Sequence, residues 1–152
     1  MNQILQRLSS IFLYTLPLRS SIPFGYYLFS KYSYLNVLKF IVFPVAIIEE
    51  SHPLGGLLFF LILFAGFVRN PNVPYFVRYN ACQALLIDIA LIIISYLLRI
   101  LSISSLGSIT SVLGSIIFIF ILSIFIYSIS QCIYGVEPEI PLISNSARIQ
   151  IY

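Results

Sequence analysis

The 152-residue sequence has very few charged residues, a single histidine, two cysteines and no tryptophan. Charged residues make up 9% of the chain and hydrophobic residues 60%, with a mean hydropathy of +1.03. A water-soluble domain of this composition would expose far too much apolar surface. The scarcity of charge therefore excludes that class and predicts a polytopic membrane protein.

Positive charge is present but dispersed. Eight Lys and Arg residues outnumber five Asp and Glu residues, which gives a formal net charge of +3 and a pI near 9.0. These basic residues never form a run, whereas nucleic-acid-binding proteins gather them in a patch or stripe. The positive excess therefore indicates membrane topology, and we expect no nucleic-acid partner.

The chain is poor in residues that carry catalysis or bind metals. The histidine, His52, lies near Glu49 and Glu50, but the spacing matches no zinc signature, so a solvated hairpin is favoured. Cys82 and Cys132 fall at similar depths, which allows a disulfide, yet the reducing side of a membrane favours two plain thiols. A serine nucleophile would lack a base beside it. We expect no enzymatic activity, no metal and no other cofactor.

Four apolar segments are candidates for membrane helices, which need about 20 residues to cross a hydrocarbon core of about 30 Å. The third begins at Pro74, which suits the first turn of a helix, and the fourth stops before Gly135, a typical helix end. We predict an all-α membrane protein in which residues 32–134 form a four-helix transmembrane domain and residues 135–152 a C-terminal tail. The four segments are residues 32–48, 54–68, 74–101 and 112–134.

Residues 1–31 contain no acidic side chain and include an apolar helical face formed by Ile4, Leu8 and Ile11. Pro17 and Pro23 then divide this stretch into short pieces. The lack of acidic residues is typical of transit peptides, but the amphipathic face favours a helix that lies in the membrane interface. We therefore predict an N-terminal interfacial amphipathic segment over residues 1–31.

Basic residues orient the predicted helices, because positive charges in short loops stay on the side from which insertion occurs. The opposite side receives only Arg99, together with the acidic hairpin at Glu49 and Glu50. Both termini and the loop over residues 69–80 are therefore expected to face the cytoplasm-equivalent compartment. The basic residues assigned to that side are Arg7, Arg19, Lys31, Arg69, Arg78 and Arg148.

One carboxylate, Asp88, falls in the membrane-depth part of the third segment, where a charge costs about 2.5 to 3.5 kcal/mol. Helical spacing places it on one face with the small residues Ala84 and Ser95. We predict that this face packs inward and that Asp88 is a structural acceptor for Tyr127 or Ser123 of the fourth segment. The alternative is a hydrophilic path for a substrate or a proton, which four closely packed helices disfavour.

Other residues complete the candidate sites. Asn80 and Gln83 are expected to make polar contacts near a helix end, and with Asp88 and Tyr127 they form the candidate polar core or substrate path. Lys39 reaches a depth comparable to that of Asp88. Tyr75, Phe76 and Tyr79, with Arg78, are typical of an interfacial aromatic belt. Helices are expected to approach closely at Gly55, Gly56, Gly66 and Gly114.

The centre of the chain carries a specific motif, and distinctive stretches lie near both ends. The residues concerned are Tyr14-Thr15-Leu16-Pro17, Val68-Arg69-Asn70-Pro71-Asn72, Phe76-Val77-Arg78-Tyr79-Asn80, Gln83-Ala84, Asp88 and Glu139-Ile140-Pro141. The central motif resembles the signature of the twenty-kilodalton subunit of Tic, the protein-import translocon of the chloroplast inner envelope. The stretches near both ends extend the resemblance over residues 14–152, with Tyr79 in place of the usual Phe and Cys82 in place of the expected Met.

The resemblance implies a four-span subunit with both termini in the stroma, taking part in preprotein import. Its partners would be other Tic subunits and preproteins in transit, and Arg69, Asn70, Phe76 and Arg78 would form an interfacial motif. A compositional bias typical of AT-rich genomes favours the plastid-encoded algal form over a cyanobacterial plasma-membrane relative. Because a packed four-helix bundle has no lumen for a polypeptide, we expect a homo- or hetero-oligomer.

Two other classes of function stay open at this stage. One is a small-solute or proton permease subunit that uses Asp88 as a relay. The other is a purely structural membrane assembly protein. A permease predicts solute uptake by the purified chain in liposomes, whereas a translocon subunit predicts crosslinks to an arrested preprotein.

Overall fold

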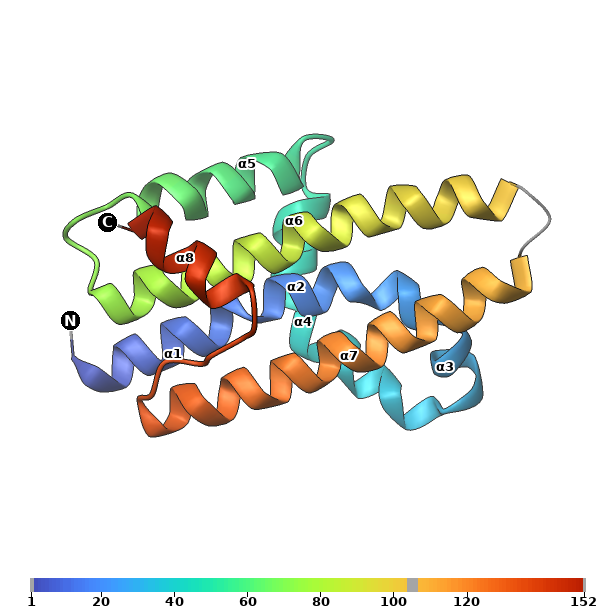
Figure 1. The fold of residues 1–152 in the computed structure, drawn as a ribbon, viewed down its shortest axis with the longest axis horizontal. Helices are drawn as coiled ribbons and strands as arrows, with labels where there is room; N and C mark the ends of the chain where they lie inside the picture. Colours follow the sequence, from blue (N-terminus) through green and yellow to red (C-terminus); the bar gives the residue numbers. More distant parts are fainter. Residues whose placement is uncertain (1, 104–106, 152) are drawn as a thin grey trace.

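The computed structural model describes residues 2–103 and 107–151, and all the regular structure in these ranges is helical, which confirms the all-α prediction. Two long helices dominate, and shorter ones pack around them (Figure 1). The elements are α1 (Gln3–Leu13), α2 (Thr15–Ser21), the 3-10 helix η1 (Ile22–Gly25), α3 (Tyr26–Lys31), the 3-10 helix η2 (Ser33–Asn36), α4 (Val37–Glu50), α5 (Gly55–Leu63), the π-helix η3 (Phe64–Val68), α6 (Tyr75–Ile103), α7 (Gly107–Tyr134) and α8 (Ile143–Ile151).

The helices α6 and α7 form an antiparallel pair along the long axis of the molecule (Figure 1). Within them, Tyr75–Ser102 and Ile109–Tyr134 are long and apolar enough to cross a membrane. The end of α7 has a physical cause, because Gly135 adopts a φ of 74° and its N–H donates to the carbonyl of Cys132. The N–H of Val136 donates to Gln131, which completes a glycine-terminated helix end.

The first two predicted spans are not two separate rods. Ser33–Glu50 and Gly55–Val68 form a pair bent by 105°, and they meet the length needed for a span only together. The α-helices within them, α4 with 14 residues and α5 with 9, reach only about 21 Å and 14 Å. The described residues thus contain two clear spans, or three if the bent pair is one span. Figure 1 shows the tip of this hairpin part of the way along the bundle rather than at its far end.

The N-terminal segment packs within the bundle instead of lying apart from it. Helix α2 contacts α4, α6 and α7, and its residues Leu16 and Leu18 are almost fully buried together with Tyr14. The apolar residues of α1 behave differently, since Ile4 and Leu8 are more than half exposed. The apolar face of α1 is thus directed largely outward, and the amphipathic pattern gave no indication that α2 enters the core.

The outer surface of the helices is apolar, as a lipid environment requires. Large hydrophobic side chains are exposed on the two long helices and on the bent pair, while polar residues lie mostly at the ends or inside. This arrangement supports the membrane class deduced from composition. Examples of exposed residues are Phe40, Phe43, Leu57, Ile62, Ile93, Leu97, Ile116, Ile119 and Phe120.

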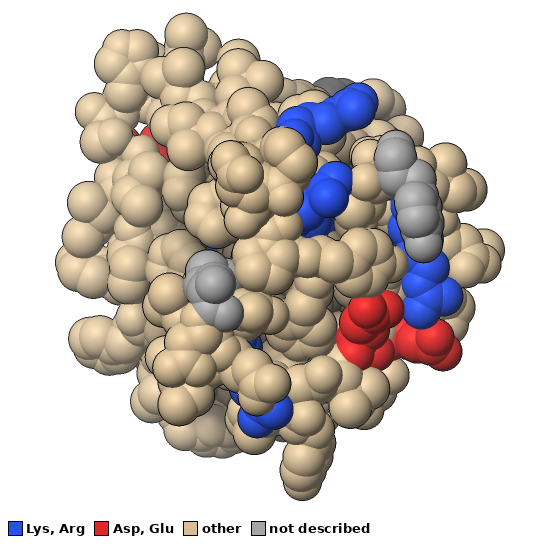
Figure 2. Space-filling view, turned by 90° about the vertical axis from the view of Figure 1, so that its left-hand side faces the viewer, with Lys and Arg blue, Asp and Glu red and all other residues tan. Residues whose placement is uncertain are grey.

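Both termini and the turn before α6 lie at one end of the bundle, and α3 lies at the other (Figure 1). Figure 2 looks onto the first of these ends and shows basic side chains distributed across it, with acidic ones beside them. Lys31, the last residue of α3, therefore lies at the opposite end, and Arg19 pairs with Glu50 of the hairpin. These two residues do not belong with the basic group of the termini, because the N-terminal segment runs the length of the bundle.

Two of the four glycines mark close approaches. A Cβ on Gly114 would lie 2.9 Å from the carbonyl oxygen of Phe24, so only glycine lets η1 seat against α7. A Cβ on Gly55 would meet the carbonyl of Glu49 within the hairpin. Gly56 and Gly66 have nothing within 4 Å, so close packing at these two positions was wrongly predicted for the single chain.

We predict that Gly114→Ala destabilises the fold by about 1 to 3 kcal/mol, because the added methyl group must displace backbone. Gly56→Ala is the matched control: it adds the same group in open space and should be neutral or stabilising by up to about 1 kcal/mol. The free energy of unfolding in mild detergent, followed by circular dichroism, measures both. Equal effects of the two substitutions would contradict the proposed contact.

Candidate functional site: a buried polar network and an acidic cavity

Asn80 and Gln83 lie fully buried on one face of α6, where they share the hydroxyl of Tyr14. This oxygen is 2.7 Å from Gln83 Oε1 and 2.9 Å from Asn80 Oδ1. A hydroxyl has one proton, so Tyr14 donates to only one of these oxygens at a time. The thiol of Cys132 lies 3.6 Å from Asn80 Oδ1 and supplies a second, weaker donor.

The same amides tie the C-terminal tail to α6. Gln83 Nε2 donates to the carbonyl of Pro138 at 3.1 Å and to Ser144 Oγ at 2.7 Å. The hydroxyl of Tyr79 also donates to Pro138, at 3.0 Å, and Asn80 Nδ2 donates to the carbonyl of Phe76 at 2.7 Å. We call this set the buried network; its members are Tyr14, Tyr79, Asn80, Gln83, Cys132, Pro138 and Ser144.

Arg78 joins two helix ends at the border of the buried network. Its Nε donates to the carbonyl of Val68, the last residue of η3, and its Nη2 donates at 2.7 Å to Ile151, the last residue of α8. The final carbonyls of a helix have no partner inside the helix, and a cation there also complements the helix dipole. Arg78 thus links the C-terminal ends of η3 and α8.

The remaining residues of the predicted interfacial motif shape the turn before α6. The guanidinium of Arg69 lies 5.5 Å from the centre of the Phe64 ring, and Asn70 Oδ1 accepts from the N–H of Asn72. Phe76 packs against the core. Tyr79, predicted to be part of the belt, is instead fully buried, because its hydroxyl reaches the carbonyl of Pro138.

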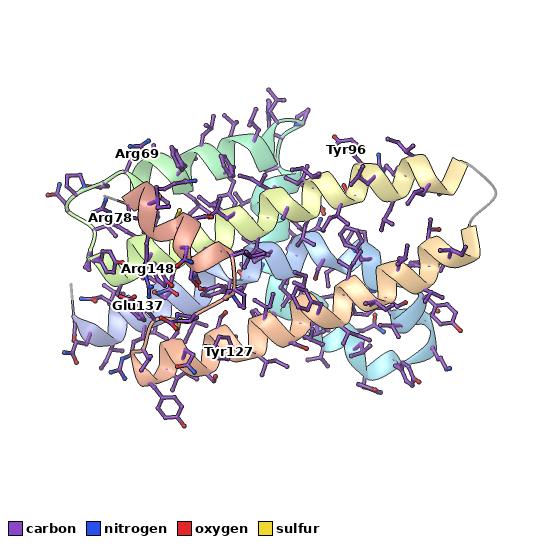
Figure 3. The ribbon with its side chains drawn as sticks, viewed as in Figure 1. Arg69, Arg78, Tyr96, Tyr127, Glu137 and Arg148 are labelled. Carbon is purple, nitrogen blue, oxygen red and sulfur yellow. The ribbon has the colours of Figure 1, made fainter. Side chains whose placement is uncertain are left out.

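Charged residues cover the tail side of the network (Figure 3). Arg148 Nη2 lies 3.1 Å from Glu139 Oε1 and 3.6 Å from Glu137 Oε2, and its guanidinium stands 5.6 Å from the centre of the Tyr79 ring. The hydrogen bond to Glu139 raises the pKa of Arg148 further. Glu139 is largely exposed, and Arg148 and Glu137 are partly exposed, so these ion pairs contribute little to stability.

Asp88 does not belong to the buried network. Its side chain is only 6% exposed, and Oδ1 has no hydrogen-bond partner in the described part of the chain. Ser20, on α2, lines the same space as the Asp88 carboxyl group. Asp88 lies near the midpoint of α6, about 20 Å from either end of that helix.

The predicted partners of Asp88 lie elsewhere. The Tyr127 hydroxyl accepts from the N–H of Glu139 at 3.3 Å, near the tail, and Ser123 donates to the carbonyl of Ile119 in its own helix. Asp88 shares a cavity with residues of α2 and the α4–α5 hairpin, and the described residues that line it include none of α7. Lys39 likewise stays at the start of α4, 5.0 Å from the centre of the Phe29 ring.

Asp88 faces an open cavity of about 800 Å³ between α2, the α4–α5 hairpin and α6. Acidic, basic and hydroxyl groups share this space with apolar side chains. We call it the acidic cavity; it is lined by Ser20, Glu49, Gly56, Leu57, Phe60, Asp88, Ile89, Ile92, Ser95, Tyr96 and Arg99.

Glu49, which lines the acidic cavity, and its neighbour Glu50 both lie close to Arg19. Arg19 Nη2 lies 2.6 Å from Glu50 Oε1, and Arg19 Nε lies 3.9 Å from Glu49 Oε2. The closer contact is to Glu50, so Arg19 is mainly engaged there. The structure thus brings Glu49 and Asp88 to the same cavity, a juxtaposition that the sequence did not suggest.

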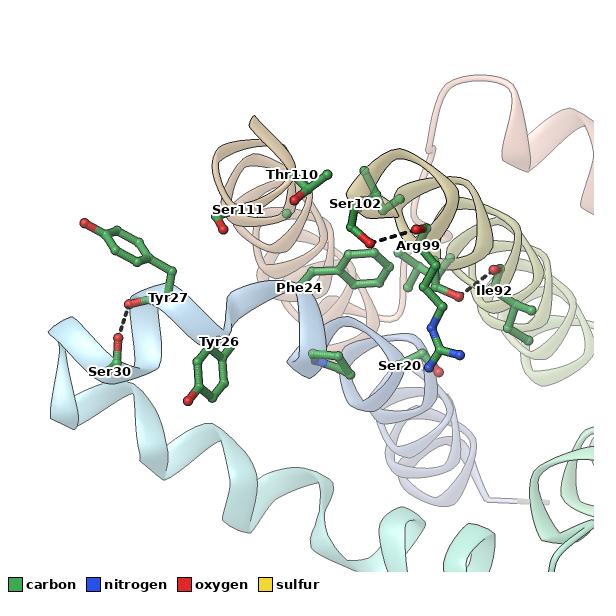
Figure 4. Close-up of a pocket in the computed structure, with 15 residues that line it drawn as sticks. Ser20, Phe24, Tyr26, Tyr27, Ser30, Ile92, Arg99, Ser102, Thr110 and Ser111 are labelled. Carbon is green, nitrogen blue, oxygen red and sulfur yellow. Dashed lines mark hydrogen bonds between the residues drawn. The ribbon is translucent and has the colours of Figure 1, made fainter. Parts of the chain in front are cut away.

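A second open cavity, of about 610 Å³, lies on the other side of this part of α6, toward α3 and α7 (Figure 4). It shares Ser20, Ile92, Ser95 and Arg99 with the acidic cavity. Figure 4 shows the side chain of Arg99 extending toward Ser20. This direction follows from helix geometry, because side chains lean toward the N-terminus of their helix.

Sequence reasoning identified Asn80 and Gln83 but missed most of their partners. Tyr14 and Ser144 are essential parts of the network, and neither stands out by charge or periodicity. The only signal was indirect: Tyr14 and the tail around Pro141 fall within the stretches that carried the family resemblance.

Comparisons with known proteins agree with that resemblance. The family model described as "Chloroplast import apparatus Tic20-like" matches residues 3–147. A Tic20 family protein of Synechocystis sp. is 30% identical over 149 residues, covering 95% of this chain and 92% of its own. Protein TIC 20-II, chloroplastic, of Arabidopsis thaliana is 36% identical over 96 residues, 63% of this chain and 46% of that protein. Tic20 family protein Ycf60 of Gracilaria tenuistipitata var. liui is 34% identical over 91 residues, 55% and 44% of the two chains. The matched part is therefore less than half of the last two relatives.

We predict that Tyr14→Phe lowers the free energy of unfolding by about 1 to 3 kcal/mol, because it leaves buried amide oxygens short of a donor. The control is Tyr26→Phe, which removes the same hydroxyl from a side chain that is 80% exposed and should change stability by less than about 0.5 kcal/mol. Denaturant titration in mild detergent compares the two. A Tyr14→Phe chain as stable as the control would show that the buried network is not needed for the fold.

Proposed function

The chain belongs to the Tic20-like family of the chloroplast import apparatus, and on this basis we propose that it is a membrane subunit of the protein-import translocon of the plastid inner envelope. It helps to form the path taken by preproteins and has no catalytic role. The observation that carries the proposal is the extent of the family match, which includes every helix from α1 to α7 and the start of α8. Its partners are other translocon subunits and preproteins in transit.

We infer that the chain crosses the membrane four times, with a different set of segments from the one expected from hydropathy. The first crossing is α1, α2 and η1, about 33 Å from Gln3 to Gly25. The bent pair is the second, and α6 and α7 are the third and fourth. An even number of crossings agrees with the position of both termini at one end (Figure 1). The basic residues Arg7, Arg69, Arg78 and Arg148 support a stromal location for that end.

The proposed topology predicts the labelling of two introduced cysteines in intact inner-envelope vesicles. Tyr27→Cys, on α3, should react with a membrane-impermeant maleimide added outside, whereas Asn145→Cys, on α8, should react only after detergent is added. The chain without an added cysteine is the control, since Cys82 and Cys132 are buried. Protection of Tyr27→Cys would instead support an interfacial N-terminal segment on the stromal side, and labelling of Asn145→Cys alone would invert the topology.

A translocation path needs more walls than one copy provides. An extended polypeptide with its side chains is roughly 10 Å wide, and helices packed 8 to 10 Å apart leave no such lumen. We therefore predict that the functional unit is a homo- or hetero-oligomer in which this chain forms part of a wall. Purified chains kept monomeric, as verified by mass, should not open a polypeptide-sized pore in a planar bilayer. A pore formed by monomers alone would refute the packing argument.

The proposed function is tested with an arrested preprotein in import-competent plastids. A photoreactive amino acid placed at successive positions of the preprotein should give adducts with this chain when the arrested segment lies in the inner envelope. A preprotein without its targeting sequence is the control and should give none. Adducts with other envelope proteins but never with this chain would contradict the proposal, and solute uptake by the purified chain in liposomes would favour a permease.

A further inference from the structure

One oxygen of the Asp88 carboxylate is placed as a binding group without a bound partner. This oxygen, Oδ1, is buried and has no hydrogen-bond partner, and the nearest charged groups that line the same cavity are Glu49 and Arg99. No ion pair joins Asp88 to an Arg or Lys within 4.0 Å among the described residues. A buried carboxylate at membrane depth is costly and usually serves the interior of an assembly or a path.

Nearby polar groups in the protein have other engagements. Arg19 is held by Glu50 and, at longer range, by Glu49, so it is not available to Asp88. Ser95, seven residues beyond Asp88 on the same face, donates to the carbonyl of Ile92. Arg99 lies roughly three turns beyond Asp88 and reaches toward Ser20 (Figure 4). The acidic cavity thus has excess negative charge at its inner end.

The dimensions and depth of the cavity limit what can occupy it. About 800 Å³ is the size of a site for a sizeable ligand or several amino-acid side chains. The inner end, at Asp88, is about 20 Å from both ends of α6, which is beyond the reach of lipid head groups at the membrane surface. Lipid tails carry no charge and cannot satisfy Oδ1. An occupant must bring a donor or a positive charge to this depth.

We propose that the acidic cavity binds Lys or Arg side chains of an extended polypeptide segment, with Asp88 as the principal contact and Glu49 as a second carboxylate. The inference rests on the proposed import function, which supplies polypeptide at this depth. Hydroxyl groups of Ser20, Ser95 and Tyr96 line the same space and suit the polar backbone of an unfolded chain. Apolar residues such as Phe60 and Leu57 accept its other side chains.

The test places a photoreactive amino acid at Ser95 and compares two arrested preproteins in import-competent plastids. The two differ only in the arrested segment, in which every Lys and Arg of one is replaced by Gln in the other. The adduct from Ser95 should be several-fold stronger with the basic segment. Equal adducts with both segments would overturn the proposal.

Variants of the carboxylates identify the contact. Asp88→Asn should reduce the adduct of the basic segment to that of the neutral one, while Asp88→Glu should retain the difference. Glu139→Gln is the control, because it removes a carboxylate that is 72% exposed and lies outside the cavity lining. If the Asp88→Asn chain accumulates normally and its adduct is still several-fold stronger with the basic segment than with the neutral one, the role of Asp88 is refuted. If that variant fails to accumulate, a second variant, Ser95→Lys, is used with the photoreactive amino acid moved to Tyr96. The added cation should occupy the carboxylates and abolish the preference for the basic segment. An unchanged preference would refute the site.

Other occupants give distinct results. If Arg99 were the true partner of Asp88, Arg99→Gln would abolish discrimination as Asp88→Asn does, which would overturn the proposal; we expect Arg99→Gln to preserve it. An adduct between two copies of the chain, or with lipid, in place of the preprotein would also overturn it. Failure at Ser95 with adducts formed elsewhere on the chain leaves the import function standing, whereas the absence of any preprotein adduct contradicts both.

Discussion

The fold depends on one constraint: buried polar groups inside a membrane protein must find partners within the protein. The hydroxyl of Tyr14 lies between Asn80 and Gln83 and donates to one of their oxygens at a time, while the thiol of Cys132 offers Asn80 a second donor. Gln83 then uses both of its N–H groups on the tail, at Pro138 and Ser144. Residues from the beginning, middle and end of the chain are therefore held in one register, and the end that carries both termini is built around this contact.

Asn80, Gln83 and Asp88 are all polar residues within one apolar segment of the sequence, yet their surroundings in the structure differ. The two amides lie within two turns of the start of α6, where the N-terminal segment and the tail both pack, so every donor and acceptor has a partner nearby. Asp88 lies beyond the reach of the tail, against the open space left by the bent α4–α5 pair. A sequence pattern predicts on which face of a helix a polar side chain lies. Its hydrogen-bond partner, however, depends on which distant segments of the chain cover that face.

Much of the fold followed from composition and periodicity, namely the helical membrane class, the long rods α6 and α7 and the helix end at Gly135. The bent pair could not be found in this way, because hydropathy measures length and not direction, and both halves are apolar. The core position of α2 was also hidden, since Pro17 and Arg19 suggest a surface segment. Pro17 is tolerated because it stands in the first turn of α2, and Arg19 because Glu50 pairs with it.

The position of Arg19 changes how the charges of this family member orient it. Counted along the sequence, Arg19 and Lys31 add to the basic side; in the structure they lie away from it, which leaves Arg7, Arg69, Arg78 and Arg148 to mark one end. Arg7 and Arg78 also donate to the carbonyls of Ile133, Val68 and Ile151, at the ends of three helices. These two cations therefore complete helix termini at the end of the bundle for which a stromal location is proposed. The basic residues that support the proposed orientation and those that bind helix-end carbonyls thus lie at the same end of the bundle. Removing the N-terminal segment, which carries Arg7, would therefore disturb both the packing of the helices and their proposed orientation in the membrane.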